Sequence, residues 1–336
     1  MKKRNLGNKG FKISEVGLGC WQIGGNWGNE IDKKKAFEIL SEAVNNGITF
    51  FDTADVYGDG RSEELIGEFF KNSNANIKIA TKFGRGSDLF PNNYTEQALR
   101  DSVDASRERL NIDCIDLLQL HCIPTEVLKK GEVFDWLRIL KKEGKITHFG
   151  ASVETVEQGL LCLEQEELQS LQVIYNIFRQ KLTKELLPQA HAKGVGIIVR
   201  LPLASGLLTG KFTNETQFLE NDHRNFNRDG QAFNVGETFA GLPFETGIKL
   251  SDELKAYCPE SMSMVEMALR WILDHKEVST IIPGASSPNH IYGNSKASNL
   301  PPLSEKLMID LEEFYNKNIH NHIRSILDKK TCANKM

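Results

Sequence analysis

The sequence predicts an α/β fold in which eight parallel strands alternate with helices and close into a (β/α)8 barrel. Three segments share one order, a helical pattern, then a glycine, then an apolar run of β type, at Gly47, Gly144 and Gly194. Glycine at such a place ends a helix in the left-handed conformation, after which a strand begins. Eight strands in 336 residues fit one barrel, so a single domain over residues 1–336 is expected.

Each predicted strand is a short apolar run, and the segments between the runs have helical period. The eight runs are Val16–Trp21, Thr49–Asp52, Lys78–Lys82, Ile115–His121, Ile146–Ser152, Gln172–Asn176, Gly196–Arg200 and Thr280–Pro283. Helix starts are marked by Asp32, by Thr183, by Ser263 with Glu266 at capping-box spacing, and by Ser287 followed by Pro288. This alternation is typical of a TIM barrel.

Two segments depart from strict alternation. A long loop follows the seventh strand, roughly Ala204 to Glu260, and it includes an amphipathic helix beginning near Pro243. One extra helix is expected at the C-terminus after Ser304. The rival fold is an open doubly wound sheet, but the turn "GLGCWQIGGNWG" does not supply its phosphate-binding glycine spacing.

Composition narrows the class of partner. A formal charge of −4 and a pI near 6.1 argue against nucleic acid as the main partner, because binding a polyanion normally needs a basic face. The chain has no signal peptide pattern and no apolar run long enough for a bilayer, so we expect a cytoplasmic protein without a membrane partner. Its six cysteines form no CxxC pair, so reduced thiols and no metal site are expected.

The predicted strands end, one after another, in functional groups. These are Trp21, Asp52, Lys82, His121, Ser152, Asn176 and Arg200, followed by the "PGASS" turn. In a parallel barrel the carboxyl ends of all strands meet on one face, where active sites lie. Each residue alone has a simpler explanation, for example an Asx turn at Asp52 or a lysine with its amine in water at Lys82. Their combination favours a common pocket.

Three of these groups, together with Tyr57 in the loop after Asp52, suit carbonyl reduction. A lysine ammonium (Lys82) beside a tyrosine hydroxyl (Tyr57) should lower the tyrosine pKa from about 10 toward neutrality, and Asp52 would keep the lysine charged. Tyr57 would then act as a general acid, and His121 could donate a hydrogen bond to the carbonyl oxygen. The group contains no hydride donor, so a cofactor must supply one.

The whole chain resembles the aldo-keto reductases. The segments that carry the resemblance are "GLGCWQIGG", "FFDTADVYGDGRSEELIG", "ATKFG", "LLQLHC", "GKITHFGAS", "QVIYNIF", "PLASGLLTGKF", "ALRWIL" and "IIPGASSP", in family order and at family spacing. The resemblance implies a (β/α)8 barrel that uses NADP(H), less often NAD(H), to reduce small aldehydes or ketones. It also places the family's catalytic tetrad on Asp52, Tyr57, Lys82 and His121, with Trp21 toward the substrate.

The resemblance further implies the cofactor contacts. They fall on Ser152, Gln172, Arg200, Leu203, Ser205, Leu207, Lys211, Gly284, Ser286, His290 and Asn294. Arg200 occupies the ring-stacking position, which is usually aromatic. Val153, His290 and Gly293 depart from common family residues, and Lys211 with His290 favours NADP over NAD.

Two other functions stay open. The family includes relatives similar to potassium-channel β-subunits, so the chain could be a nucleotide-binding regulatory subunit with little turnover. A lyase with a Schiff base at Lys82 is disfavoured, since a paired carboxylate keeps a lysine protonated. The substrate, the oligomeric state and the direction of reaction are not predicted. The pocket mouth is expected around Trp27, Phe83–Phe90 and Asn221–Phe239.

Overall fold

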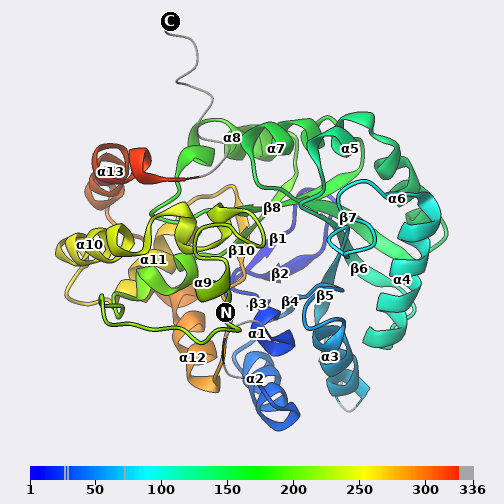
Figure 1. Cartoon of the computed structure of the whole chain (residues 1–336), viewed down its shortest axis with the longest axis horizontal. Helices are drawn as coiled ribbons and strands as arrows, with labels where there is room; N and C mark the ends of the chain where they lie inside the picture. The colour runs from blue at the N-terminus through cyan, green and yellow to red at the C-terminus, as the bar shows by residue number, and fades with distance from the viewer. Residues whose placement is uncertain (26–27, 29, 72, 74, 325–336) are drawn as a thin grey trace, which may run out of the picture.

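The computed structural model describes residues 1–25, 28, 30–71, 73 and 75–324. Eight parallel strands pair in chain order, each with the next, and form the ring at the centre of Figure 1. They are β3 (Leu18–Gly19), β4 (Phe50–Asp52), β5 (Lys78–Phe83), β6 (Ile115–His121), β7 (Ile146–Ser152), β8 (Leu168–Ile174), β9 (Gly196–Arg200) and β10 (Val278–Ile281). The predicted (β/α)8 barrel is confirmed.

Backbone contacts between the first and last barrel strands close the ring. Parallel bridges join Val16 to Ile281 and Gly19 to Gly284. The amide of Gly17 donates to the carbonyl of Ile281 at 2.8 Å, and the amide of Ile281 donates to the carbonyl of Glu15 at 3.0 Å. Closure leaves these two strands without a free edge, which a parallel sheet in water would otherwise expose.

The helices surround the strands (Figure 1). The outer helices are α2 (Lys33–Asn45), α3 (Arg61–Lys71), α4 (Glu96–Leu110), α5 (Thr125–Lys130), α6 (Glu132–Lys142), α7 (Val156–Leu163), α8 (Leu186–Ala192), α11 (Met264–Leu273) and α12 (Pro288–Lys296). The others are α1 (Trp21–Gly24), α9 (His223–Phe226), α10 (Phe244–Leu254) and α13 (Glu305–Phe314). No helix among the described residues is long and apolar enough to cross a bilayer.

Local sequence signals account for many helix ends. The Asp32 side chain accepts a hydrogen bond from the Lys35 amide at the start of α2, and Ser263 with Glu266 forms a capping box at the start of α11. Gly47, Gly144 and Gly194 have φ between 71° and 77°, as the helix-to-strand transitions require. The extra helix after Ser304 is α13, whose first turn this serine caps.

Several predicted boundaries are wrong. The first strand spans only Leu18–Gly19, because the chain turns into α1 at Trp21. The sixth barrel strand runs from Leu168 to Ile174 instead of Gln172–Asn176, and the eighth from Val278 to Ile281 instead of Thr280–Pro283. Thr183 lies inside a short 3₁₀ helix, Lys181–Lys184, where its hydroxyl donates to the Gln180 carbonyl, so it does not cap α8.

A two-stranded hairpin that the sequence did not predict lies across the amino-terminal end of the barrel. Its strands are β1 (Lys3–Asn5) and β2 (Lys12–Ser14). Leu6 and Ile13 of this hairpin are fully buried in one cluster with apolar side chains from the barrel interior, namely Phe50, Ala80, Leu117, Ile198 and Ile282. The hairpin therefore completes the core at this end.

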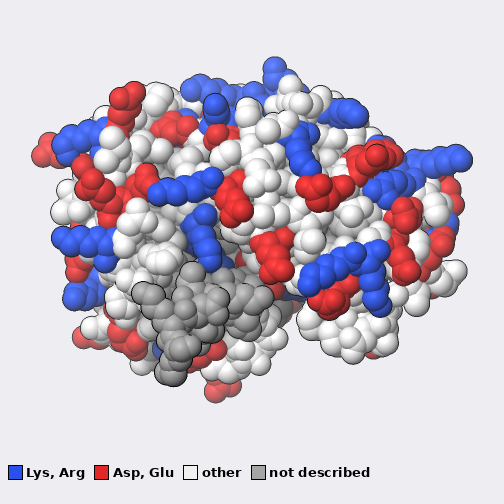
Figure 2. Space-filling view, turned by 90° about the horizontal axis from the view of Figure 1, so that it is seen from above, with Lys and Arg blue, Asp and Glu red and all other residues white. Residues whose placement is uncertain are grey.

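The long excursion after β9 is ordered. It holds the 3₁₀ turns Ala204–Thr209, Val235–Glu237 and Phe239–Gly241 besides α9 and α10. The side chain of Asn227 is buried and bonds three groups of the excursion, the amides of Ala232 and Phe233 and the hydroxyl of Thr238. In the space-filling view, acidic and basic side chains alternate over the visible face without one dominant sign (Figure 2). The expectation of a single domain over 1–336 stays a prediction.

Candidate active site

The carboxyl ends of the strands open on a cavity of about 1220 Å³. Of the residues singled out from sequence, its walls include Trp21, Asp52, Tyr57, His121, Gln172, Arg200, Leu203, Ser205, Lys211, Gly284, Ser286, His290 and Asn294. Lys82, Ser152 and Leu207 are buried beneath this wall. Asn176, expected at a strand end, is fully buried and instead bonds the backbone of Leu201 and Phe178.

Lys82 joins the two neighbours that the sequence analysis expected. Its ammonium nitrogen lies 2.6 Å from Oδ1 of Asp52 and 3.1 Å from the hydroxyl of Tyr57. It donates a third bond to the carbonyl of Thr53, also at 2.6 Å. All three donors of the ammonium are therefore used, and the fully buried side chain is held in one position.

Two amides fix the other oxygen of Asp52. Gln119 and Gln172 donate to Oδ2 at 2.9 and 2.7 Å. Strand register explains this convergence, because Asp52, Gln119 and Gln172 lie near the carboxyl ends of β4, β6 and β8 and point into the barrel. A carboxylate with three charge-assisted or amide donors is satisfied although it is buried.

Burial changes the ionisation of this pair. Burial alone would lower the pKa of Lys82, yet Asp52 and Tyr57 raise it above its usual 10.5, so the lysine stays charged and a Schiff base at this amine is disfavoured. Burial raises the pKa of Tyr57 above 10.0, and Lys82 opposes this only in part. The expectation that Lys82 brings the pKa of Tyr57 toward neutrality is therefore wrong in its net direction, because desolvation of the phenolate outweighs the attraction.

His121 lies next to Tyr57 in the wall of the cavity. The two rings meet edge to face with centroids 6.0 Å apart. Burial and the cations Arg85, Lys82 and Arg200 hold the pKa of His121 well below its usual 6.5, so its ring is neutral at neutral pH. Nδ1 of this ring is buried and has no hydrogen-bond partner among the described residues.

The reactive corner is the part of the site formed by Lys82, Tyr57 and His121, and Trp21 lies against it. Its ring stacks against Tyr57 at 5.9 Å and lies 6.1 Å from the ring of Phe233 in the long excursion. Phe90 lines the same mouth. Two of the three expected mouth segments thus contribute, whereas Trp27 lies outside the described residues.

The loop that carries Tyr57 is held by close backbone contacts. A Cβ at Gly24 would lie 2.5 Å from the Tyr57 carbonyl oxygen, and one at Gly58 would lie 2.0 Å from that of Gly24. Behind the loop, the buried carboxylate of Glu63 accepts from Arg109 at 2.7 Å and from the hydroxyl of Thr81. These contacts position the hydroxyl of Tyr57 over Lys82.

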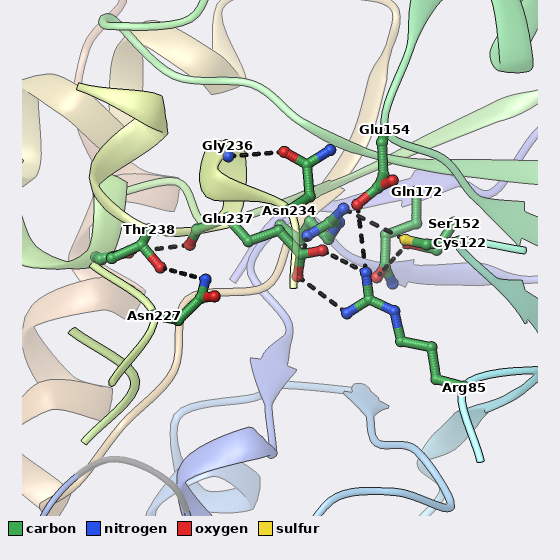
Figure 3. Close-up of polar contacts among 12 residues, drawn as sticks. Arg85, Cys122, Ser152, Glu154, Gln172, Asn227, Asn234, Gly236, Glu237 and Thr238 are labelled. Atoms are coloured by element: carbon green, nitrogen blue, oxygen red, sulfur yellow. Dashed lines mark hydrogen bonds and ion pairs between the residues drawn. The ribbon is translucent and has the colours of Figure 1, made fainter. Parts of the chain in front are cut away.

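Four ionisable side chains, three of which the sequence analysis missed, form a cluster beside the reactive corner: Arg200, Glu237, Arg85 and Glu154. Figure 3 shows how Arg85, Glu154 and Glu237 of this cluster lie relative to one another. Glu237 of the long excursion accepts hydrogen bonds from Arg85 and forms an ion pair with Arg200, whose Nη1 lies 3.2 Å from Oε2. Arg85 also contacts Glu154 at 3.3 Å. Glu237 stays ionised, because the two arginines outweigh the effect of its burial and hold its pKa well below 4.5. No motif joins these residues, since Arg85 and Glu237 are 152 positions apart.

Cys122 lies within the same cluster. Its sulfur is 3.5 Å from Arg200 Nη2 and 3.6 Å from the hydroxyl of Ser152. Cys122, Glu154 and Glu237 offer ligand atoms within 4.8 Å of one another, but the two arginines already pair with the carboxylates. Cys122 is one of five free cysteines in the described part of the chain; Cys332 lies outside it.

The cavity has room and chemistry for a nucleotide cofactor. Its volume exceeds the roughly 300–1,000 Å³ of an ordinary ligand pocket, and it extends from Tyr57 to the start of α12. At the inner end, Nε of Arg200 is buried without a hydrogen-bond partner in the described residues. At the outer end it is lined by Lys211, His290 and Lys296, which suit phosphate groups.

Comparisons with known proteins place the chain in one family. Residues 15–316 match the sequence model described as the aldo/keto reductase family. The chain is 30% identical to the NADH-specific methylglyoxal reductase of Escherichia coli K12, with 89% of this chain and 94% of the relative covered. It is 29% identical to a probable voltage-gated potassium channel subunit beta of Arabidopsis thaliana, with 92% and 95% covered.

A solved structure is also similar. The holo form of aldo-keto reductase AKR11C1 from Bacillus halodurans superimposes with a TM-score of 0.76 at 27% identity, and the match covers 94% of this chain and 96% of that one.

Proposed function

The chain belongs to the aldo/keto reductase family, and from this premise we propose that it is an NADP(H)-dependent reductase of small aldehydes or ketones. Members of this family are NAD(P)-dependent oxidoreductases. The observation that carries the proposal is the position of Lys82 between Asp52 and Tyr57 at the wall of a cavity large enough for cofactor and substrate together.

Tyr57 is the proton donor in this proposal. Its raised pKa keeps the hydroxyl protonated at neutral pH, so a proton is available for the carbonyl oxygen. The ammonium of Lys82, 3.1 Å away, stabilises the phenolate that remains after transfer. Asp52 keeps that ammonium charged and oriented.

His121 orients the carbonyl. A neutral imidazole has one N–H to donate, carried by Nδ1 in one tautomer and by Nε2 in the other. A hydrogen bond from this ring would hold the carbonyl oxygen within reach of Tyr57 and stabilise its developing negative charge. Trp21 and Phe233 supply apolar surface for the rest of the substrate.

The cofactor would occupy the length of the cavity. When bound, the nicotinamide supplies the hydride that a carbonyl carbon needs and that side chains cannot provide. Gln172 and Arg200 would contact its nicotinamide end, with Ser152 beneath them. The expected contacts at the other end are Leu203, Ser205, Leu207, Lys211, Gly284, Ser286, His290 and Asn294.

We propose NADP(H) as the preferred cofactor, with NAD(H) as the alternative. Lys211, His290 and Lys296 all line the outer cavity and could face a 2′-phosphate. His290 contributes a hydrogen bond more than a charge, because burial and the cations Lys211 and Lys35 lower its pKa. NAD(H) is the alternative because one relative is described as an NADH-specific methylglyoxal reductase.

A nucleotide-binding regulatory subunit with little turnover is the second candidate. Similarity to a potassium channel subunit beta supports it, and such a protein could retain the same four residues at the cavity. It would bind NADPH tightly and release it slowly while consuming almost none.

One assay separates the two candidates. Consumption of NADPH and of NADH would be followed with a reactive aromatic aldehyde, for wild type and Tyr57→Phe. Turnover that falls by orders of magnitude in Tyr57→Phe supports the reductase. Tight NADPH binding with negligible turnover in wild type supports the regulatory subunit, and failure to bind either nucleotide contradicts both.

A further inference from the structure

Four ionisable side chains form a cluster next to the reactive corner. From the barrel outward they are Arg200, Glu237, Arg85 and Glu154. Burial and the neighbouring Glu237 raise the pKa of Glu154 to about 7, so Glu237 is the carboxylate of this cluster that stays ionised at neutral pH. Glu237 is the centre of this cluster, since its two carboxylate oxygens contact both arginines. Its side chain is only 5% exposed and that of Arg200 is 12% exposed, so water screens the pair weakly. Figure 3 shows Arg85 and Glu154 converging on Glu237.

The charge of Arg200 acts at the place where chemistry would occur. Arg200 is among the cations that lower the pKa of both Tyr57 and His121. It ends β9, lines the cavity and contacts Cys122, the residue next to His121. A nicotinamide ring that serves a carbonyl held by Tyr57 and His121 must therefore lie close to this guanidinium.

The oxidation state of the nicotinamide makes that charge important. The oxidised ring carries a positive charge and the reduced ring is neutral. An uncompensated arginine in a poorly screened site would therefore repel the oxidised cofactor and leave the reduced one almost unaffected. A counter-charge on Arg200 is needed if the same pocket is to hold both forms.

We propose that Glu237 is a positioning residue that neutralises Arg200 beside the nicotinamide, so that the pocket accepts the oxidised cofactor as well as the reduced one. This inference rests on the proposed function. It assigns a role to the long excursion after β9, because that segment delivers the carboxylate to the barrel strands.

The backbone around Glu237 fixes where its carboxylate lies. The Asn234 side chain accepts from the Gly236 amide at 2.8 Å, and the Asn234 carbonyl accepts from the Glu237 amide at 2.9 Å. Arg179 donates to the Gly236 carbonyl at 3.3 Å and leaves no space for a Cβ at Gly236. The carboxylate thus reaches Arg200 from a turn that is itself held in place.

The test is to measure dissociation constants of NADP⁺ and NADPH by fluorescence titration without substrate. Glu237→Gln keeps the size of the side chain and removes its charge. We expect it to weaken NADP⁺ binding about tenfold or more and NADPH binding less than about threefold. Each tenfold increase in the ratio of the NADP⁺ dissociation constant to the NADPH dissociation constant raises the reduction potential of the bound two-electron couple by about 30 mV.

Two further variants separate charge from structure. Glu154→Gln changes a side chain of the same cluster that contacts Arg85 and whose pKa near 7 leaves it only partly ionised, so it should change the ratio of the two dissociation constants much less. The double variant Arg200→Gln with Glu237→Gln removes the cation as well as its counter-charge, so it should return the ratio toward that of wild type. A structural defect of the excursion would persist in the double variant.

The outcomes distinguish the inference from the function on which it rests. If wild type binds neither nucleotide, the proposed function fails. If wild type binds both and Glu237→Gln weakens both equally, or changes neither, the role of Glu237 is refuted while the reductase remains. A selective loss of NADP⁺ binding that the double variant reverses supports it.

Discussion

Lys82 contacts Tyr57 twice, through its hydroxyl at 3.1 Å and over its ring at 4.6 Å from the centroid. The two contacts fix the direction of the hydroxyl as well as its distance. The arrangement places a buried cation beside the hydroxyl of Tyr57, where it can stabilise the ionised form, which leads to the first prediction.

Tyr57→Phe should lower kcat with an aromatic aldehyde by about 10²–10⁴-fold, the usual contribution of a general acid. NADPH binding should change little, since the ring and its contact with Trp21 remain. Steady-state kinetics and nucleotide titration check this. Tyr257→Phe is the matched control, because Tyr257 packs on Phe314 away from the cavity. Equal effects of the two changes would refute the assignment.

Asp52→Asn should destabilise the fold. The change leaves the fully buried Lys82 ammonium without its carboxylate, and breaking one partner of a buried ion pair costs about 3–5 kcal/mol. Urea unfolding measures the loss. Asp310→Asn, which breaks an exposed pair with Lys306, serves as control and should have little effect. If the urea midpoints of the two variants were equal, Asp52 would not be needed to compensate the buried charge of Lys82.

Asp55 should make stability depend on pH. Burial and Glu63 raise its pKa from 3.8 to about 7, while the Val56 amide, Arg109 and Lys82 oppose the rise. Between these two values the folded state binds more protons than the unfolded state, so the free energy of unfolding falls as pH rises. Asp55→Asn removes this contribution. The free energy of unfolding of the variant, relative to that of wild type, should therefore rise between about pH 4 and pH 7. Parallel urea-derived stability curves for the two proteins would contradict this.

Gly24→Ala should impair catalysis through the backbone of Tyr57. The added Cβ would lie 2.5 Å from the Tyr57 carbonyl oxygen and 2.9 Å from its Cβ, so the loop must move. A displacement of about 1 Å at a reacting group can cost about 10²-fold in rate. The control is Gly86→Ala, whose Cβ meets Leu89 at an ordinary 3.7 Å. The prediction fails if kcat of Gly24→Ala matches that of the control.

Lys211→Met should weaken NADPH more than NADH. Lys211 lines the outer cavity and lowers the pKa of His290, which places its charge near the expected 2′-phosphate. An increase in KM for NADPH of about tenfold with little change for NADH is expected from the loss of one charged contact. Lys249→Met on the exposed face of α10 is the control. An equal increase for both nucleotides would place Lys211 at the pyrophosphate instead.

Much of this fold was predictable because its signals are local. A cap such as Asp32 and a terminating glycine such as Gly144 act within one turn, so their sequence pattern is sufficient. The hairpin was missed because its strands have three residues each, too few for a period to be recognised. Trp21 was assigned to a strand because it extends an apolar run, although the chain turns into α1 there.

The site residues at strand ends could be predicted from the sequence, whereas Glu237 in the excursion after β9 could not. Asp52, Lys82 and His121 each end an apolar run or come close to its end, and barrel closure brings such residues together. Glu237 comes from an irregular segment whose path depends on tertiary contacts such as those of Asn227. The pKa of Tyr57 was predicted in the wrong direction because a sequence states which charge is near but not how much water is lost.

The hairpin of β1 and β2 covers the amino-terminal end of the barrel. Leu6 and Ile13 pack against the inner faces of the strands and close this end of the described barrel. A ligand of the cavity must therefore enter and leave at the opposite end, where the strands finish. The excursion after β9 lines the cavity there through Phe233 and Glu237, so a change in this segment can alter access to the cavity as well as its chemistry.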